Sequence, residues 1–199
     1  ARPETRGDAF ADTNATGWDI SASGRAAVWA KNNSREEILA AFKRREVYGT
    51  TGPRIVLRVF GGFSFNDKDA KAKNLAAIGY KKGVSMGGDL TQAPSGRAFS
   101  LLIHAVKDPN EANLDRLQVI KGWLDKDGES HEKIYEVAWS GDRRLDANGK
   151  LPPVGNTVNL ESGRYSNDIG AAQLTTVWTD PDFDRARRAF YYVRVLQIP

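Results

Sequence analysis

Several short segments of the sequence alternate apolar and polar residues, which is the period of a β-strand with one buried face. In the first segment, residues 54–60, the side chains of Ile55, Leu57 and Val59 share a face. The other segments centre on residues 99–105, 117–119, 135–139, 174–178 and 191–195. Because turn-forming residues separate these segments and few helical patterns intervene, the sequence predicts a mainly β fold. We expect an antiparallel, immunoglobulin-like β-sandwich over residues 54–199.

A helix is predicted before the first strand. Ser34 and Glu37 have the spacing of a capping box, in which each side chain binds a backbone N–H at the start of the helix. Basic residues follow at the other end, where cations interact favourably with the helix dipole. We expect a helix over about residues 34–46, closed by Tyr48 and Gly49. Its apolar stripe consists of Ile38, Leu39, Ala41 and Phe42.

Three other segments carry weaker patterns. Residues 24–30 (GRAAVWA) form a short apolar run, which indicates an extended segment. Residues 67–78 have room for a short helix. Residues 1–23 are polar and indicate a loop, anchored by Phe10 and Trp18.

Composition limits the classes of function. Of 199 residues, 40% are hydrophobic and 10% aromatic, which is enough for a packed core. The net charge of +4 is small and the charges are interspersed, so we expect neither nucleic acid nor a membrane as a partner. There is no cysteine, which excludes disulfides, thiolate metal sites and thiol catalysis.

Metal binding is not expected from the histidines or from the one calcium-like motif. Only His104 and His131 are present, with no second histidine close in sequence to converge on a metal or a catalytic triad. Residues 125–128 (DKDG) resemble the first half of a calcium loop, but the twelfth position, Glu136, falls in a predicted strand. An Asp-Gly hairpin turn explains the same residues more simply.

One turn is a candidate anion-binding site. Thr50, Thr51 and Arg54 flank a Gly-Pro turn, and turn amides together with a guanidinium favour an anion. A rigid junction between helix and strand is the competing interpretation, because Pro53 presets such a turn.

Three tryptophans are a second candidate surface. Trp123, Trp139 and Trp178 alternate with other residues in predicted strands, and together they are able to line a sugar-binding face. We favour a role in the core, because aromatic side chains of a small sandwich bury large apolar areas there.

Residues 34–55 (SREEILAAFKRREVYGTTGPRI) resemble the characteristic motif of a bacterial family of unknown function, DUF3604. The resemblance extends over almost the whole chain. It continues through residues 58–63 (RVFGGF), 80–90 (YKKGVSMGGDL), 107–124 (KDPNEANLDRLQVIKGWL), 148–157 (NGKLPPVGNT) and 190–199.

The resemblance implies a relation to the PHP-type (polymerase and histidinol phosphatase) metal-dependent hydrolases. In such proteins a distorted β/α barrel holds metal ions through histidines and carboxylates, and metal-bound hydroxide attacks a phosphoester or related ester. The histidine-rich motifs lie upstream of the matching segment, so the resemblance assigns no catalytic residue, metal ligand or cofactor to this chain. A divalent metal is expected only in the full-length parent, and residues 1–53 are expected to be a remnant of the end of its barrel domain.

The functional expectation is the C-terminal accessory region of a metal-dependent hydrolase, inactive by itself, with the upstream barrel domain as its partner. The start at Ala1, without a methionine, leads us to expect a piece of a longer protein. The alternative is a carbohydrate- or partner-binding β-sandwich module. A purely structural lid is a third interpretation, which an apolar patch around Phe10, Trp18, Trp29 and Phe42 would favour. Homo-oligomerisation stays open, and we expect the bacterial periplasm or cytoplasm as the location.

Overall fold

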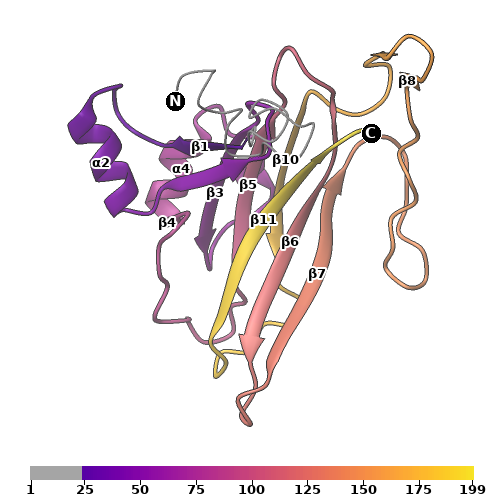
Figure 1. The fold of residues 1–199 in the computed structure, drawn as a ribbon. Helices are drawn as coiled ribbons and strands as arrows, with labels where there is room; N and C mark the ends of the chain where they lie inside the picture. Colours follow the sequence, from indigo (N-terminus) through magenta and orange to yellow (C-terminus); the bar gives the residue numbers. More distant parts are fainter. Residues whose placement is uncertain (1–23) are drawn as a thin grey trace, which may run out of the picture.

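The computed structural model describes residues 24–199, which form a mainly β fold with antiparallel sheets and few helices (Figure 1). The four-stranded sheet has the order β10 (Gln173–Thr179), β5 (Ser100–Val106), β3 (Val56–Gly62) and β4 (Gly83–Ser85). The three-stranded sheet has the order β11 (Ala189–Gln197), β6 (Leu114–Leu124) and β7 (Ser130–Trp139). Two small sheets pair β1 (Arg25–Val28) with β2 (Val47–Thr50), and β8 (Val158–Asn159) with β9 (Arg164–Tyr165). The predicted mainly β class is confirmed, as is the extended segment at β1.

One apolar core lies between the two larger sheets. Leu57 of β3 and Leu101 and Ile103 of β5 belong to it, together with Leu117 and Val119 of β6. Successive side chains of a strand point to opposite faces, so the alternation seen in the sequence places these residues on the inner faces. The two sheets meet along one edge, where β10 contacts β7 and β6.

Two short helices cover the other face of the four-stranded sheet. The sequence predicted a single short helix here, whereas the chain forms α3 (Asp67–Ala70) and α4 (Leu75–Lys82). Phe60 and Leu102 are fully buried in the cluster beneath them. Gly79 allows α4 to approach closely, because a Cβ at this position would lie 2.3 Å from a ring carbon of Phe60.

The predicted N-terminal helix is confirmed as α2 (Arg35–Lys43), although its end was predicted wrongly. The side chain of Ser34 accepts a hydrogen bond of 3.3 Å from the backbone N–H of Glu37, as a capping residue does. Gly49 does not close the helix, because it lies in β2 and pairs with Ala26 of β1. The left-handed residue after the helix is Arg45, with a φ of 61°.

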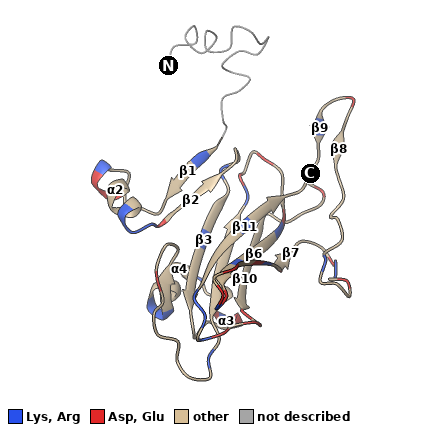
Figure 2. Ribbon diagram, turned by 60° about the horizontal axis from the view of Figure 1, so that its bottom comes forward, with Lys and Arg blue, Asp and Glu red and all other residues tan. Residues whose placement is uncertain are grey.

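The β1–β2 sheet and α2 project from one part of the molecule, and the β8–β9 hairpin projects from another (Figure 1). Charged residues of both signs are spread over the elements (Figure 2). The division predicted at residue 53 stays a prediction, although the indole N–H of Trp29 donates across it to the carbonyl oxygen of Leu57 at 2.9 Å. Phe10 and Trp18 lie outside the described residues. Within residues 24–199, no helix is long and apolar enough to cross a membrane.

Candidate functional site

An open groove of about 1130 Å³ lies between the two larger sheets. β3 and β4 form one wall and β11 the other, so the groove lies away from the edge where β10 contacts β7. Its lining is part apolar and part polar. The apolar lining includes Leu57, Val59, Phe63, Val84, Phe99, Leu101, Tyr191 and Val193.

Cations predominate among the charged residues of the groove. The charged lining residues are Arg45, Asp89, Arg185, Arg187 and Arg188. The guanidinium of Arg45 pairs with Asp89 at 2.8 Å, and that of Arg187 lies 3.6 Å from the carboxylate of Asp184. Arg185 and Arg188 are exposed and form no ion pair with any described residue. The loop before β11 therefore brings two uncompensated positive charges to the edge of a hollow with apolar walls.

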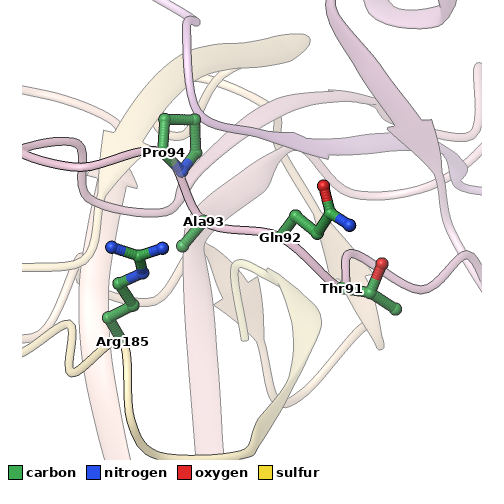
Figure 3. Close-up of a pocket in the computed structure, with 5 residues that line it drawn as sticks. All are labelled: Thr91, Gln92, Ala93, Pro94 and Arg185. Atoms are coloured by element: carbon green, nitrogen blue, oxygen red, sulfur yellow. The ribbon is translucent and has the colours of Figure 1, made fainter.

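A smaller hollow of about 380 Å³ adjoins this groove. Its lining residues are Thr91, Gln92, Ala93, Pro94 and Arg185 (Figure 3). The guanidinium of Arg185 lies near Pro94 and Ala93, and the polar ends of Gln92 and Thr91 follow along the same loop (Figure 3). Thr91, Ala93 and Arg185 line both hollows, so Arg185 stands where the two meet.

A buried ion pair lies beside one wall of the groove. Lys121 and Asp180 are each 2% exposed, and the Nζ of Lys121 is 2.6 Å from Oδ2 of Asp180. The hydroxyl of Tyr191 donates to the same oxygen at 2.6 Å, and the backbone N–H of Asp182 donates to the other carboxylate oxygen at 2.9 Å. Lys121 also donates to the carbonyl of Asp182 at 2.8 Å. Such hydrogen bonds offset part of the desolvation of a buried pair.

The two tyrosines of this cluster hold their protons tightly. Burial and the hydrogen bond to Asp180 raise the pKa of Tyr191 far above its usual range. Burial and a 2.7 Å hydrogen bond to Asp182 raise the pKa of Tyr135 in the same way. Lys133 also contacts Asp182. Both phenols therefore act as fixed hydrogen-bond donors, and the cluster joins β6, β7 and β11 to the loop after β10.

A second polar network connects α4 to β2 and β3. Glu46 is 2% exposed and accepts hydrogen bonds from the hydroxyl of Tyr80 at 2.5 Å and from Nε of Arg44 at 2.8 Å. Burial alone would raise the pKa of Glu46, but these hydrogen bonds outweigh it and lower the pKa. Arg58 donates to the Tyr80 oxygen at 2.9 Å and lies 3.9 Å from the ring centroid of Trp29. These polar side chains therefore find their hydrogen-bond partners within the fold.

The predicted anion-binding turn already contacts a carboxylate of the chain. The backbone N–H of Arg54 donates to Asp108 at 2.7 Å, and the N–H of Asn110 donates to it at 3.1 Å. These hydrogen bonds lower the pKa of Asp108. The hydroxyl oxygen of Thr50 is buried, whereas Thr51 and Arg54 are exposed. Binding of an external anion at this turn stays a prediction, and such an anion would compete with Asp108 for the N–H of Arg54.

The histidines make separate contacts. Nδ1 of His104 lies 2.7 Å from the hydroxyl of Thr175, and burial lowers the pKa of His104. Nε2 of His131 lies 2.7 Å from Asp125, and that hydrogen bond is the main cause of the lowered pKa of Asp125. Within residues 24–199, no group of three or more His, Cys, Asp or Glu side chains is placed to hold a metal ion. These residues do not fit a metal centre, and we assign no metal-dependent step to them.

The Asp-Gly segment forms the predicted hairpin turn. It joins β6 to β7, whose last and first residues Leu124 and Ser130 are paired. Asp125 accepts hydrogen bonds of 2.9 Å from the backbone N–H groups of Asp127 and Glu129, and Gly128 takes a φ of 84°. The carboxylate that resembled a calcium ligand therefore stabilises the turn.

The three tryptophans make different contacts and are all half-buried. Trp178 packs against the main core. The indole N–H of Trp139 donates to the carbonyl of Arg143 at 2.7 Å. Trp123 stacks on His131 with the ring centroids 5.4 Å apart. The favoured role in the core therefore holds for Trp178, and the alternative of a sugar-binding face is untested.

Comparison with known proteins gives one family. The sequence profile described as "Protein of unknown function (DUF3604)" matches residues 2–199. The chain belongs to the DUF3604 family. No curated protein and no solved structure matches it.

In this DUF3604 chain, neither the groove nor the buried ion pair was predicted as a site from the sequence. The only local signal for the groove is the run of three arginines within residues 185–188, directly before a predicted strand. Lys121 lies two residues after Val119 in β6, so its side chain points to the same inner face of the sheet. Such a position is unusual for a lysine. An inward-facing lysine was therefore a detectable sign of a buried carboxylate partner.

Proposed function

We propose that this chain is the non-catalytic, ligand-binding accessory region of a metal-dependent hydrolase acting on phosphoesters or related esters. The binding role is supported by the open groove between the two sheets, which has apolar walls beside a cationic loop. The hydrolase part of the proposal is supported by the resemblance to PHP-type enzymes.

The groove favours a binding role over a purely structural one. Apolar side chains that line an open hollow remain in contact with water, and covering them releases free energy. Val59 and Val193 line the groove, are only half-buried, and pack against the main core. A ligand that fills the groove would therefore extend the core of the protein.

The proposed architecture is an immunoglobulin-like β-sandwich that follows the last elements of a truncated β/α barrel. Two antiparallel sheets around one shared core support the sandwich. The resemblance supports the barrel, with residues 1–53 as its remnant and the upstream domain as the partner of this chain.

The binding role is tested with an uncharged fluorescent probe. N-phenyl-1-naphthylamine should increase in fluorescence with the wild-type chain, because the groove offers it an apolar environment. Val193→Arg, on the β11 wall, and Val84→Arg, on the β4 wall, should each abolish the increase. Leu160→Arg is the matched control, because Leu160 is 91% exposed in the β8–β9 hairpin and lies outside the groove. If the folded groove variants, checked by circular dichroism, still bind the probe as wild type does, the groove is not the binding site.

The hydrolase part is tested with metal-stripped protein reloaded with zinc or manganese. We expect the 199-residue chain alone to turn over no substrate in phosphoester and carboxylester panels. We expect turnover from a longer protein in which a barrel domain precedes this chain. Turnover by the chain alone would contradict its accessory role, and an inactive longer protein would contradict the hydrolase assignment.

A further inference from the structure

The chemistry of the groove specifies the class of its ligand, provided that the groove is the binding site proposed above. We propose that it binds an amphiphilic anion, a free long-chain carboxylate. The aliphatic tail lies along the floor between β3 and β11, and the carboxylate meets Arg185 and Arg188.

Two hydroxyl groups in the lining of the groove already have partners within the protein. The hydroxyl of Tyr48 donates to the carbonyl of Ile55 at 3.1 Å, and the hydroxyl of Tyr191 donates to Asp180 at 2.6 Å. Both polar groups are therefore engaged within the protein. A polar group of a sugar or a peptide placed against these two tyrosines would lose its hydrogen bonds to water without replacement, which costs about 1–3 kcal/mol for each unsatisfied group. An aliphatic chain loses none.

The rim supplies the charge. Four arginines and one aspartate line the groove, so its lining carries a net charge of +3. Two of the arginines have acidic partners, whereas Arg185 and Arg188 have none among residues 24–199. A guanidinium binds a carboxylate through two parallel hydrogen bonds, which makes this anion a good match.

The surroundings of Arg185 add further donors. Arg185 lies where the groove meets the smaller hollow, with Gln92 and Thr91 along the facing loop (Figure 3). An amide NH₂ and a hydroxyl both donate hydrogen bonds to a carboxylate. Figure 3 shows these two donors farther along the loop than Pro94 and Ala93, which lie next to the guanidinium, so the carboxylate is assigned to the arginines.

The size of the groove favours a long chain over a small acid. Sites for small molecules measure roughly 300–1,000 Å³. At about 1130 Å³ the groove lies above that range. A short acid would leave most of the apolar lining in water, whereas a long tail covers it.

The experiment compares dodecanoate with dodecanol, its uncharged analogue, by isothermal titration calorimetry below the micelle concentration. We expect dodecanoate to bind at least about tenfold more tightly, because each tenfold step corresponds to about 1.4 kcal/mol and a charge-assisted pair supplies that much. The double variant Arg185→Glu/Arg188→Glu should remove this preference and leave dodecanol binding unchanged. Arg144→Glu should change neither affinity, since Arg144 is exposed and lies outside the groove.

The outcomes separate the two proposals. Equal affinity for dodecanoate and dodecanol would overturn the anion inference and leave the groove as a binding site. Failure of these ligands and of the uncharged probe to bind would overturn both. An effect of Arg144→Glu equal to that of the double variant would show a general charge effect and overturn the inference. Co-sedimentation with phosphatidylglycerol vesicles that the double variant loses would identify a membrane lipid as the ligand and overturn the assignment of a free carboxylate.

Discussion

Lys121 and Asp180 show how a charge is accommodated inside this small β domain. Removing two charges from water costs several kcal/mol per ion, and mutual attraction offsets this only when further hydrogen bonds are made. Here the Asp180 carboxylate also accepts hydrogen bonds from Tyr191 and from the backbone N–H of Asp182, so neither of its oxygens lacks a partner. Removing one partner of this pair therefore costs more stability than the intact pair contributes.

Breaking this pair is predicted to be severe. Asp180→Ala leaves the Lys121 ammonium, 3% exposed, without its carboxylate, and we expect a loss of about 3–5 kcal/mol in the free energy of unfolding. Lys133→Ala removes the partner of Asp182 from a pair whose side chains are 50% and 49% exposed, and should cost less than about 1 kcal/mol. Urea unfolding of both variants measures the difference. Equal losses would show that the Lys121–Asp180 pair is not buried as described.

The raised pKa of Tyr191 predicts a pH dependence of stability. The folded protein holds this proton more tightly than the unfolded chain, in which tyrosine ionises near pH 10. The stabilisation is thus complete below about pH 10 and declines as the pH rises above it. Tyr191→Phe should be about 1–2 kcal/mol less stable than wild type at neutral pH, and the gap should narrow above about pH 10. Urea unfolding between about pH 7 and 11 measures it, and a gap independent of pH would refute the assignment.

At the scale of elements, α4 depends on the absence of a side chain at one position. A Cβ at Gly79 would meet three ring carbons of the fully buried Phe60 at 2.3 to 2.5 Å. Helix propensity favours alanine over glycine by about 1 kcal/mol, whereas overpacking a core costs about 1–3 kcal/mol. Because the contact is with a fully buried ring, we expect the cost of overpacking to exceed the gain in helix propensity.

We therefore expect Gly79→Ala to lower the free energy of unfolding by about 1–2 kcal/mol. In a Phe60→Ala background the Cγ and the ring are gone, and the same substitution should be neutral or stabilising. Thermal and urea denaturation of the four proteins gives the coupling directly. A stabilising Gly79→Ala in the wild-type background would mean that α4 does not pack on Phe60 as described.

Elements with a strong hydrophobic periodicity could be predicted from the sequence. Features that depend on pairing with residues far away in the sequence could not. Alternation located the strands that contain Leu57, Ile103 and Val119, and the Ser34 cap located α2, because these signals are local. The end of α2 was misplaced because Gly49 is held in β2 by its pairing with β1, and Arg45 takes the left-handed conformation instead. That pairing joins residues far apart in sequence and leaves no local pattern.

At the scale of the whole molecule, the candidate site was the least predictable part. The two sheets meet at the β10–β7 edge, and the groove lies between β3 and β11. The periodicity of the sequence predicts the strands but not this arrangement of the sheets. The turn at Thr50, Thr51 and Arg54 was visible in the sequence, but its contact with Asp108 depends on a residue 54 positions away. The sequence shows Arg185 and Arg188 within a short basic run, but nothing in it indicates the hollow beside them.

Thiol labelling of the folded protein tests whether the groove between the sheets is open to ligands. The chain contains no cysteine, so one introduced cysteine reports on a single position. Val193→Cys places a thiol on the groove wall, and Ile103→Cys places one at a fully buried core position outside the groove. We predict that a maleimide labels Val193→Cys rapidly in the folded protein, that dodecanoate slows this labelling, and that Ile103→Cys reacts only as fast as the protein unfolds. Labelling of Val193→Cys as slow as that of Ile103→Cys would show that the two sheets close over the groove, and would contradict the account.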